Sequence, residues 1–387
     1  MNYDVAVIGA GPAGATAARK LAQQNLRVVL LEKFKLPRYK PCGGGLTIKA
    51  MKLLDFDISA TLEDTSREVL FSFDSGPTLQ YLRPETVVWL VMRDKFDYLL
   101  TQQAVAAGAE LRTSFNVERV EQDESGVTLR TATESLRARF VVGADGANGT
   151  TAKSLGLMAQ RHNGVALEGE IQVSPAAQEK WRGKMLFDFG GIPWGYSWIF
   201  PKAEHLSIGV GAWYHTGAVK PREYLARFIA RQPDLREHGN LLIKGHVLPL
   251  GGRIDRFDQG RGVVAGDAAA TADPFFGEGI SFAIRSGQLA AEEIAAALAR
   301  GDGDLRRYTQ RVNAEMNDDF RYARLATHIF YRWPRFSYRT LVQGHVLSDD
   351  MIRVVEGKDT YKHLMLKAVQ SAPKLLWNML RPAGAGN

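Results

Sequence analysis

The hydrophobic pattern at the start of the chain predicts a strand, a helix and a second strand. Residues 3–9, YDVAVIG, form a short apolar run with β-branched side chains, and residues 13–24, AGATAARKLAQQ, have the alanine-rich spacing of a helix that packs closely. Residues 26–33, LRVVLLEK, predict the next strand. A strand, a glycine turn, a helix and a strand in this order form the first unit of a doubly wound α/β domain.

Alternation of apolar and polar residues dominates from about residue 158. It runs through GVALEGEIQV, KMLFDF and HLSIGVGAW and predicts a largely antiparallel sheet. GVVAGDAA and a helix beginning near Gly279 then return to the first domain. The predicted fold class is therefore α/β plus antiparallel β, with a Rossmann-type domain interleaved with a mainly antiparallel sheet domain and followed by a helical tail. The expected limits are 1–157 for the first domain with strands of the second inserted around 65–90, 158–252 for the sheet domain, 253–302 for the return to the first domain, and 303–387 for a basic helical region.

Composition narrows the class of protein. At 387 residues the chain exceeds what one core usually supports, and its 45% hydrophobic and 24% charged residues suit a folded soluble protein. One cysteine allows no internal disulfide, which suits a reducing compartment. There is no uncharged apolar run of about 20 residues and no basic leader before the first strand. We therefore expect a cytoplasmic protein that meets a membrane, if at all, peripherally at its inner face.

The positive charge is concentrated at the C-terminal end. Residues 320–387 carry 11 Lys and Arg against 4 Asp and Glu, which accounts for the whole net charge of +7. Residues 320–347 interleave arginines with aromatic residues, a pattern that suits a membrane surface, a site for a substrate diphosphate, or a solvated helical face. Nucleic acid is not expected as a partner because no nucleic-acid-binding module is recognisable.

The first glycine turn indicates a dinucleotide site. Gly9-Ala10-Gly11-Pro12-Ala13-Gly14 follows a strand and opens a helix, and Glu32, followed by Lys33, ends the next strand. Glycines let the backbone approach a pyrophosphate, the helix N-terminus offers free N–H groups, and Glu32 can accept from ribose hydroxyls. A merely structural glycine turn is the alternative. Glu32 would repel a 2′-phosphate, so FAD or NAD is favoured over NADP here.

A second stretch favours a flavin. Gly266-Asp267 precedes the turn PFFGEG, in which Gly277 and Gly279 lead into a helix near Ile280. A helix N-terminus aimed at an isoalloxazine would stabilise the negative charge of reduced flavin, and Asp267 would hold a ribityl or pyrophosphate-side hydroxyl. A helix cap with a packing turn is the alternative. Arg93 stands at a helix start, where a phosphate partner explains a cation better than exposure does.

These motifs together resemble a known superfamily. The glycine turn with Glu32, Arg93-x-x-Phe96-Asp97, Gly143-Ala144-Asp145-Gly146 and Gly266-Asp267 are similar to those of the FAD-dependent para-hydroxybenzoate hydroxylase superfamily. Within it, PRYKPCGGGL, GYSWIFPK and DPFFGEGI resemble the geranylgeranyl reductase family, over roughly residues 1–300.

The resemblance implies a flavoprotein that saturates carbon–carbon double bonds in isoprenoid chains. The substrate would be an isoprenoid lipid, a prenyl diphosphate, or a prenylated quinone or chlorophyll precursor. NADPH or a ferredoxin-like protein would supply electrons to the FAD. The residues that this assigns to the cofactor are Gly9, Gly11, Pro12, Ala13, Gly14, Glu32, Lys33, Arg93, Asp145, Gly266, Asp267, Gly277, Gly279 and Ile280.

Cys42, the only cysteine, lies between Pro41 and three glycines. An isolated alkene has no carbonyl to polarise it, so hydride from flavin N5 must be matched by a proton on the other carbon. Cys42 is a candidate donor, because apolar surroundings would keep its thiol protonated, and Gly43 and Gly44 would let the backbone approach cofactor and substrate. The alternative is a small hydrophobic residue that fills space under the loop.

Tyr196, Trp198 and Phe200 alternate along GYSWIF and therefore face one side of a strand. Core packing and the wall of a tunnel for a long hydrocarbon both explain such a stripe. Phe275, in the DPFFGEG turn, is assigned to the same substrate site.

Two other functions stay open at this point. A flavin monooxygenase that hydroxylates an aromatic ring would share the fold and the FAD residues. A flavin-containing membrane adaptor would use FAD only for folding, although the density of residues around the expected redox edge argues against it.

Overall fold

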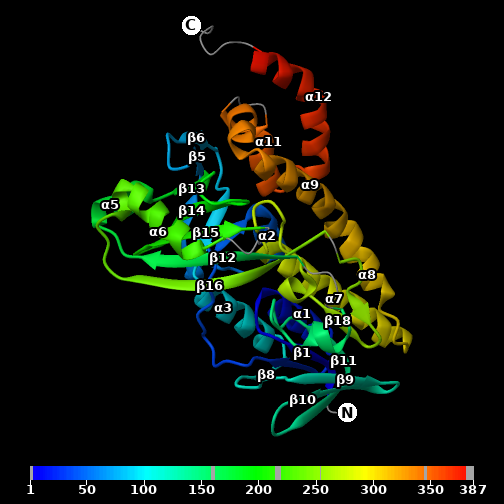
Figure 1. The fold of residues 1–387 in the computed structure, drawn as a ribbon. Helices are drawn as coiled ribbons and strands as arrows, with labels where there is room; N and C mark the ends of the chain where they lie inside the picture. The colour runs from blue at the N-terminus through cyan, green and yellow to red at the C-terminus, as the bar shows by residue number, and fades with distance from the viewer. Residues whose placement is uncertain (1–2, 158–161, 214–218, 253, 344–346, 381–387) are drawn as a thin grey trace.

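A mainly parallel sheet forms the lower half of the molecule (Figure 1). The computed structural model describes residues 3–157, 162–213, 219–252, 254–343 and 347–380. Within these residues the sheet has eight strands, in the order β17-β18-β11-β1-β2-β8, with β10 paired to β11 and β9 to β10. Its strands are β1 (Tyr3–Ile8), β2 (Val28–Leu31), β8 (Glu110–Arg112), β9 (Arg119–Asp123), β10 (Gly126–Arg130), β11 (Ser135–Gly143), β17 (Asp258–Gln259) and β18 (Gly262–Val264). The central pairings, β1 with β2 and β11, are parallel, as the strand-turn-helix unit predicted.

Two helices pack closely beside this sheet. α1 (Pro12–Ala22) and α7 (Ile280–Arg300) are in contact at Ala13 and Gly287. The two helices approach so closely that a Cβ at Gly287 would lie 2.2 Å from the Ala13 carbonyl oxygen. The small residues of both helices therefore bring the two N-termini near each other at the upper edge of the sheet. The other helices and turns of this half are α2 (Ile48–Leu53), α3 (Arg93–Ala106), α4 (Thr151–Ser154), and the 3₁₀ turns Ser59–Thr61 and Gly266–Ala269.

A second sheet lies above the first. In the described residues it has seven strands in the order β16-β12-β15-β14-β13-β5-β6, all antiparallel neighbours except β13 and β5. The strands are β5 (Glu68–Phe73), β6 (Leu79–Leu82), β12 (His162–Ile171), β13 (Lys184–Phe189), β14 (Gly195–Pro201), β15 (Leu206–Ala212) and β16 (Leu241–Leu250). α5 (Pro175–Trp181), α6 (Pro221–Arg231) and the 3₁₀ turn Pro233–Leu235 belong to this half. The alternating segments therefore form the antiparallel sheet that was predicted.

A small third sheet joins the two halves. It contains β3 (Gly45–Thr47), β7 (Val88–Val91) and β4 (Leu62–Ser66) in the order β3-β7-β4. β5 and β6 follow β4 in the chain yet lie in the second sheet, so the chain passes between the sheets more than once. The exact domain limits given above stay a proposal.

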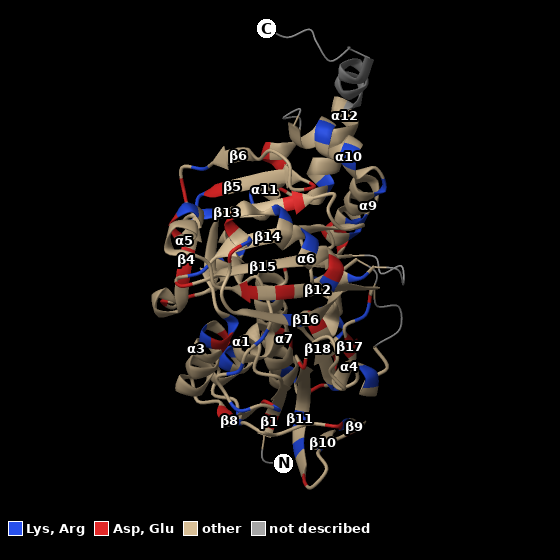
Figure 2. Ribbon diagram, turned by 60° about the vertical axis from the view of Figure 1, so that its left-hand side comes forward, with Lys and Arg blue, Asp and Glu red and all other residues tan. Residues whose placement is uncertain are grey.

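The C-terminal segment is helical, as predicted; it begins beside α7 in the lower half and then rises to the second sheet (Figures 1 and 2). It contains α8 (Arg306–Val312), α9 (Asp318–Arg332), α10 (Pro334–Ser337), α11 (Ser348–Val355), α12 (Tyr361–Leu380), and the π-helical turns Asn313–Asn317 and Tyr338–Gln343. Phe330 and Tyr338 pack in one core with Phe189 of β13, which anchors these helices on the sheet. No helix in the described ranges is long and apolar enough to cross a bilayer.

Candidate active site

A cavity of about 550 Å³ opens between the upper edge of the parallel sheet and the facing side of the second sheet. It brings together nearly all residues that the sequence motifs singled out, from segments as distant as Gly9 and Ile280. Two of the predicted residues, Gly14 and Phe275, do not line it. The predicted residues that do line it are Gly9, Gly11, Pro12, Ala13, Glu32, Lys33, Cys42, Gly43, Gly44, Arg93, Asp145, Tyr196, Trp198, Phe200, Gly266, Asp267, Gly277, Gly279 and Ile280.

The first glycine turn has a separate reason for each glycine. Gly9 has φ +100°, and a Cβ there would lie 2.3 Å from the Ala144 carbonyl oxygen. A Cβ at Gly14 would lie 1.9 Å from the Gly9 carbonyl oxygen, so Gly14 serves the packing of helix on strand. Gly11 faces space, because a Cβ there would meet only the Arg38 guanidinium, at 3.9 Å. The opening beside Gly11, at the start of α1, suits a pyrophosphate.

The Glu32 carboxylate is buried and stabilises the first glycine turn through hydrogen bonds. It accepts from the Ala10 N–H at 3.0 Å and from the Phe34 N–H at 3.1 Å, and Arg38 lies 3.5 Å away. Arg38 also bonds Asp97 at 3.0 Å. Glu32 therefore combines a structural role with its position at the cavity wall.

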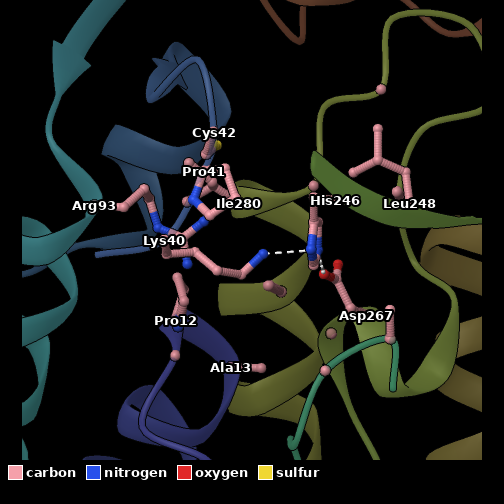
Figure 3. A pocket seen from close by; sticks show the side chains of 18 of the residues that line it. Pro12, Ala13, Lys40, Pro41, Cys42, Arg93, His246, Leu248, Asp267 and Ile280 are labelled. Carbon is pink, nitrogen blue, oxygen red and sulfur yellow. Dashed lines mark hydrogen bonds and ion pairs between the residues drawn. The ribbon is translucent and has the colours of Figure 1, made fainter. Parts of the chain in front are cut away.

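Asp267 is joined to two basic side chains across the cavity. Lys40 reaches from the cysteine loop to His246 on β16, with 2.7 Å between Lys40 Nζ and His246 Nε2, and His246 Nε2 lies 3.3 Å from an Asp267 oxygen (Figure 3). Burial opposes the charge of Asp267, but His246 and Lys40 outweigh it and hold its pKa at about 2. Asp267 is therefore an anion at neutral pH.

Arg93 has a carboxylate partner within its own helix. Its guanidinium is buried and bonds Asp97 at 2.7 Å and 2.9 Å. Burial opposes its charge, but Asp97 and then the Cys42 sulfur raise its pKa. Arg93 thus stands between Asp97 and Cys42 at the cavity wall, and a phosphate partner stays a prediction.

The cysteine loop has both apolar and polar neighbours, because Cys42 packs against the hydrophobic core as expected and also lies near cations that were not expected. Arg93 contacts the sulfur, and the Gly44 N–H points at it from 3.4 Å. Lys202, fully buried, donates to the Gly43 carbonyl at 2.7 Å and to the Val91 carbonyl at 3.1 Å. These cations come from segments that are distant in the sequence, since Arg93 begins α3 and Lys202 follows β14. The sequence of the loop alone therefore does not indicate them.

The glycines after Cys42 fit the loop against the second sheet. A Cβ at Gly43 would lie 2.8 Å from the Phe200 ring, and Gly44 has φ +67° with the Val91 carbonyl oxygen 2.0 Å from a Cβ position. Only glycine combines these contacts with that backbone conformation. The loop is consequently pressed onto the aromatic strand as well as facing the cavity.

The aromatic stripe is both core and cavity wall. Tyr196, Trp198 and Phe200 line the cavity and belong to the core between the second sheet and the C-terminal helices. The Tyr196 hydroxyl donates to the Phe276 carbonyl. Phe275 instead packs on Phe330, with ring centroids 5.4 Å apart. At this turn the wall residue is Phe276, because Phe275 is enclosed in the core by the rings of Phe276, Phe330, Tyr331 and Tyr361.

Comparisons with known proteins agree with this architecture. The FAD binding domain family model matches residues 2–188. The chain is 33% identical over 331 residues to an uncharacterized protein of Methanosarcina barkeri, covering 85% of this chain and 84% of that protein. It is 32% identical over 323 residues to a geranylgeranyl diphosphate reductase of Rhodobacter capsulatus, covering 78% and 77%.

This chain belongs to the geranylgeranyl reductase family. As a member, it is an FAD-dependent oxidoreductase. The crystal structure of a geranylgeranyl bacteriochlorophyll reductase-like protein from Thermoplasma acidophilum has the same fold, with a TM-score of 0.77 at 23% identity over 97% of this chain and 98% of that one.

The residues of this geranylgeranyl reductase family member fit FAD. Gly11 leaves room for the pyrophosphate, and Asp145 Oδ1 is buried without a hydrogen-bond partner among the described residues while its other oxygen caps Thr151 at 2.9 Å. α7 begins at Ile280 on the cavity wall, so its N-terminus is placed to favour negative charge there.

Several polar residues of the cavity and of its surroundings were not predicted from the motifs. Lys40 and Asp273 lie inside the quoted motifs but were not singled out, although a charged residue within a motif is a usable signal. Glu168 and His246 occupy β12 and β16, where the alternation of the strand was the only signal. Lys202 ends the quoted GYSWIFPK, and its full burial could not be read from the sequence.

Proposed function

We propose that this protein is an FAD-dependent reductase that saturates double bonds of a geranylgeranyl or related isoprenoid chain. The observation that carries the proposal is the position of the cysteine loop. The same cavity holds the glycine turn that fits FAD, the Cys42 loop and an aromatic wall from β14. The relative from Rhodobacter capsulatus is a geranylgeranyl diphosphate reductase, which supports the substrate class.

Each part of the cavity has a role in the proposed reaction. Gly9, Gly11 and Glu32 would hold the adenosine half of FAD, while Asp267 and the turn before Ile280 would hold the flavin half. Bound reduced FAD supplies two electrons as a hydride from N5, and NADPH or a ferredoxin-like protein would replenish them. The protein must then supply the proton, because an alkene carbon is too weakly basic to take a proton from water.

Cys42 is the proposed source of that proton. Its loop is fixed by Lys202 on one side and by the aromatic strand on the other. A thiol that delivers its proton leaves a thiolate, and Arg93 beside the sulfur would stabilise that anion. Tyr196, Trp198 and Phe200 would bind the hydrocarbon and exclude water.

A lipid surface is the proposed setting of the reaction. Along α9 and α10 an exposed apolar stripe is formed by Tyr322, Leu325, Ile329, Trp333 and Phe336. Arg332, Arg335 and Arg339 are exposed beside it. Apolar side chains flanked by arginines are complementary to a bilayer that contains anionic lipids.

Product analysis tests the proposed function. The purified yellow protein, reduced with dithionite under anaerobic conditions, should convert a geranylgeranyl substrate into products heavier by two hydrogens or multiples of two, as measured by mass spectrometry. Cys42→Ser should lower the rate by about 10²–10⁴-fold, the usual contribution of a general acid, while FAD stays bound.

The controls separate the alternatives. Unchanged substrate masses, together with oxygen uptake when aromatic compounds are added, would favour a hydroxylase instead. Full turnover by Cys42→Ser would end the proposed role of the thiol without touching the reductase proposal.

A further inference from the structure

A buried carboxyl group on β12 lies beside the cysteine loop. Glu168 is 4% exposed and lines the cavity. Its Oε1 accepts from the Ser207 hydroxyl at 2.8 Å, whereas its Oε2 is buried without a hydrogen-bond partner among the described residues. Leaving a buried oxygen without a hydrogen-bond partner costs much more free energy in a charged carboxylate than in a neutral, protonated carboxyl group.

The groups that face Glu168 come from four elements and from the loop. Ser207 belongs to β15, Lys202 follows β14, Glu170 lies two residues along the same face of β12, and Lys244 is directly opposite on β16.

The Cys42 backbone N–H points at the carboxylate, and Tyr39 of the same loop faces the pair of glutamates. Burial raises the pKa of Glu168 to about 7, against the opposing effects of Ser207 and Lys202.

Three other ionisable groups in or near the cavity have partners of their own. Lys202 donates to two backbone carbonyls, and burial lowers its pKa. Asp267 is held as an anion by His246 and Lys40. Asp273 accepts from the Phe275 and Phe276 N–H groups and from the Tyr361 hydroxyl. Glu168 combines a position at the cysteine loop with an oxygen that has no hydrogen-bond partner in the part of the chain that the structure describes.

We propose that Glu168 is the proton reservoir that recharges Cys42, a positioning and proton-transfer role that rests on the proposed reductase function. When the Cys42 thiol gives its proton to the alkene carbon, the S–H bond breaks and the C–H bond forms, while the hydride from reduced flavin completes the second C–H bond. The carboxyl group of Glu168 then gives its proton to the thiolate and becomes a carboxylate. Glu170, half-buried on the same face of β12, leads from Glu168 to solvent, where the proton is replaced.

The first test uses the single thiol as a reporter. Because Cys42 is the only cysteine, the rate of its alkylation by iodoacetamide reports one group in the oxidised holoenzyme. The pH profile of this rate should show an inflection near pH 7 in the native protein, and Glu168→Gln should remove it. Asp188→Asn is the matched control, since Asp188 is a buried carboxyl on the same sheet that does not line the cavity.

The second test follows turnover. The steady-state rate of alkene reduction, in which Cys42 must be recharged in every cycle, should fall as the pH rises through 7 in the native enzyme, because the reservoir must be protonated. In Glu168→Gln the rate should be about 10²-fold lower and should lose this dependence, with the rate of flavin reduction by dithionite unchanged. Ser207→Ala should move both inflections to higher pH, because the Ser207 hydrogen bond favours the carboxylate.

The outcomes separate this proposal from the function on which it rests. An alkylation profile and a turnover profile that are the same in Glu168→Gln, Ser207→Ala and native protein would overturn the reservoir while leaving the reductase intact. If native protein reduces no isoprenoid, the proposed function fails, and the alkylation profile still decides whether Glu168 and Cys42 are coupled. Should Glu168→Gln not fold, the Ser207→Ala shift decides alone.

Discussion

At the scale of single residues, the position of the cysteine loop is fixed by contacts with neighbouring side chains. Cys42 contacts Arg93, Gly43 lies against the Phe200 ring, and Lys202 holds the Gly43 carbonyl. The glycines are required by packing and backbone conformation, and the thiol is placed by cations. One short loop is thereby held between the nucleotide-binding half and the aromatic wall.

Trp198 tests whether the aromatic stripe binds substrate. Its indole lies flat on the adjacent strand, where a Cβ at Gly209 would be 2.1 Å from the ring. Trp198→Ala should raise the KM for long isoprenoids several-fold more than for short ones, because the lost area contacts the distal chain. Trp181→Ala is the control, since Trp181 is also 6% exposed but lies in the core on the other side of the sheet. Equal effects of Trp198→Ala on both substrates would show that the aromatic stripe serves core packing and does not bind substrate.

Asp188 predicts a pH dependence of stability. Its Oδ1 accepts from the Ser72 hydroxyl at 2.5 Å and the Ser75 N–H at 2.8 Å, and its Oδ2 is buried without a partner in the described residues. Burial raises its pKa to about 6, so the folded state holds a proton that the unfolded state releases above about pH 4. The contribution of Asp188 to the free energy of unfolding should therefore fall as the pH rises from 4 to 6 and level off above that range.

Asp188→Asn removes this charge and should keep the Oδ1 hydrogen bonds. At pH 7 the variant should be more stable than the native protein by on the order of 1–3 kcal/mol, and the difference should shrink toward pH 4. Urea unfolding at several pH values measures it. A difference that does not change with pH would contradict the assignment.

At the scale of elements, the turn before α7 is tied to the C-terminal helices. Asp273 accepts from the Tyr361 hydroxyl of α12 at 2.8 Å and 3.0 Å, and it also caps the Phe275 and Phe276 N–H groups. Thr327 of α9 donates to the Pro274 carbonyl at 2.9 Å. The C-terminal helices therefore support directly the turn that is proposed to face the flavin.

Tyr361→Phe should loosen this turn. Removing one partner of a buried carboxyl costs about 1–3 kcal/mol, and the variant should release FAD faster than the native protein. Urea unfolding and the rate of flavin release measure the two effects. In the control Tyr338→Phe, a hydroxyl that donates to the Phe71 carbonyl at 3.0 Å is lost away from the turn, so FAD release should not change. Equal FAD release in both variants would refute the coupling.

At the scale of the whole molecule, charge and exposed apolar area coincide at one end. Arginines and the exposed Trp333 and Phe336 lie on the C-terminal helices, while the hairpin of β9 and β10 lies at the opposite end (Figures 1 and 2). If the protein takes its substrate from a lipid layer, as proposed, this arrangement would orient the molecule on the membrane.

Sedimentation with liposomes tests this orientation. The protein should bind vesicles rich in phosphatidylglycerol at low salt and dissociate at high salt. Arg332→Gln with Arg335→Gln should weaken binding by roughly tenfold or more, at about 1 kcal/mol for each basic side chain. The pair Arg130→Gln with Arg137→Gln, near the β9–β10 hairpin, should have little effect. Absence of binding to these vesicles at low salt would refute the membrane surface.

The sequence by itself determined the features that depend on local periodicity and local backbone geometry. The strand, glycine turn and helix of residues 3–22, the alternating strands of the second sheet and the helical tail all follow from side-chain spacing. Most of the residues proposed for the cofactor could be singled out for the same reason, since Gly9 and Gly11 shape a turn that their own segment forms. Family membership also followed from these short motifs.

Only the tertiary structure decided which polar groups meet at the cysteine loop. Lys202 bonds the Gly43 carbonyl from 159 residues away, and Glu168 faces Cys42 because β12 pairs with β15 in one particular register. A shift of that register by one residue would turn Glu168 to the other face of the sheet. Burial, and with it the raised pKa of Glu168, depends on how distant segments pack together, which the spacing of residues along the chain does not contain.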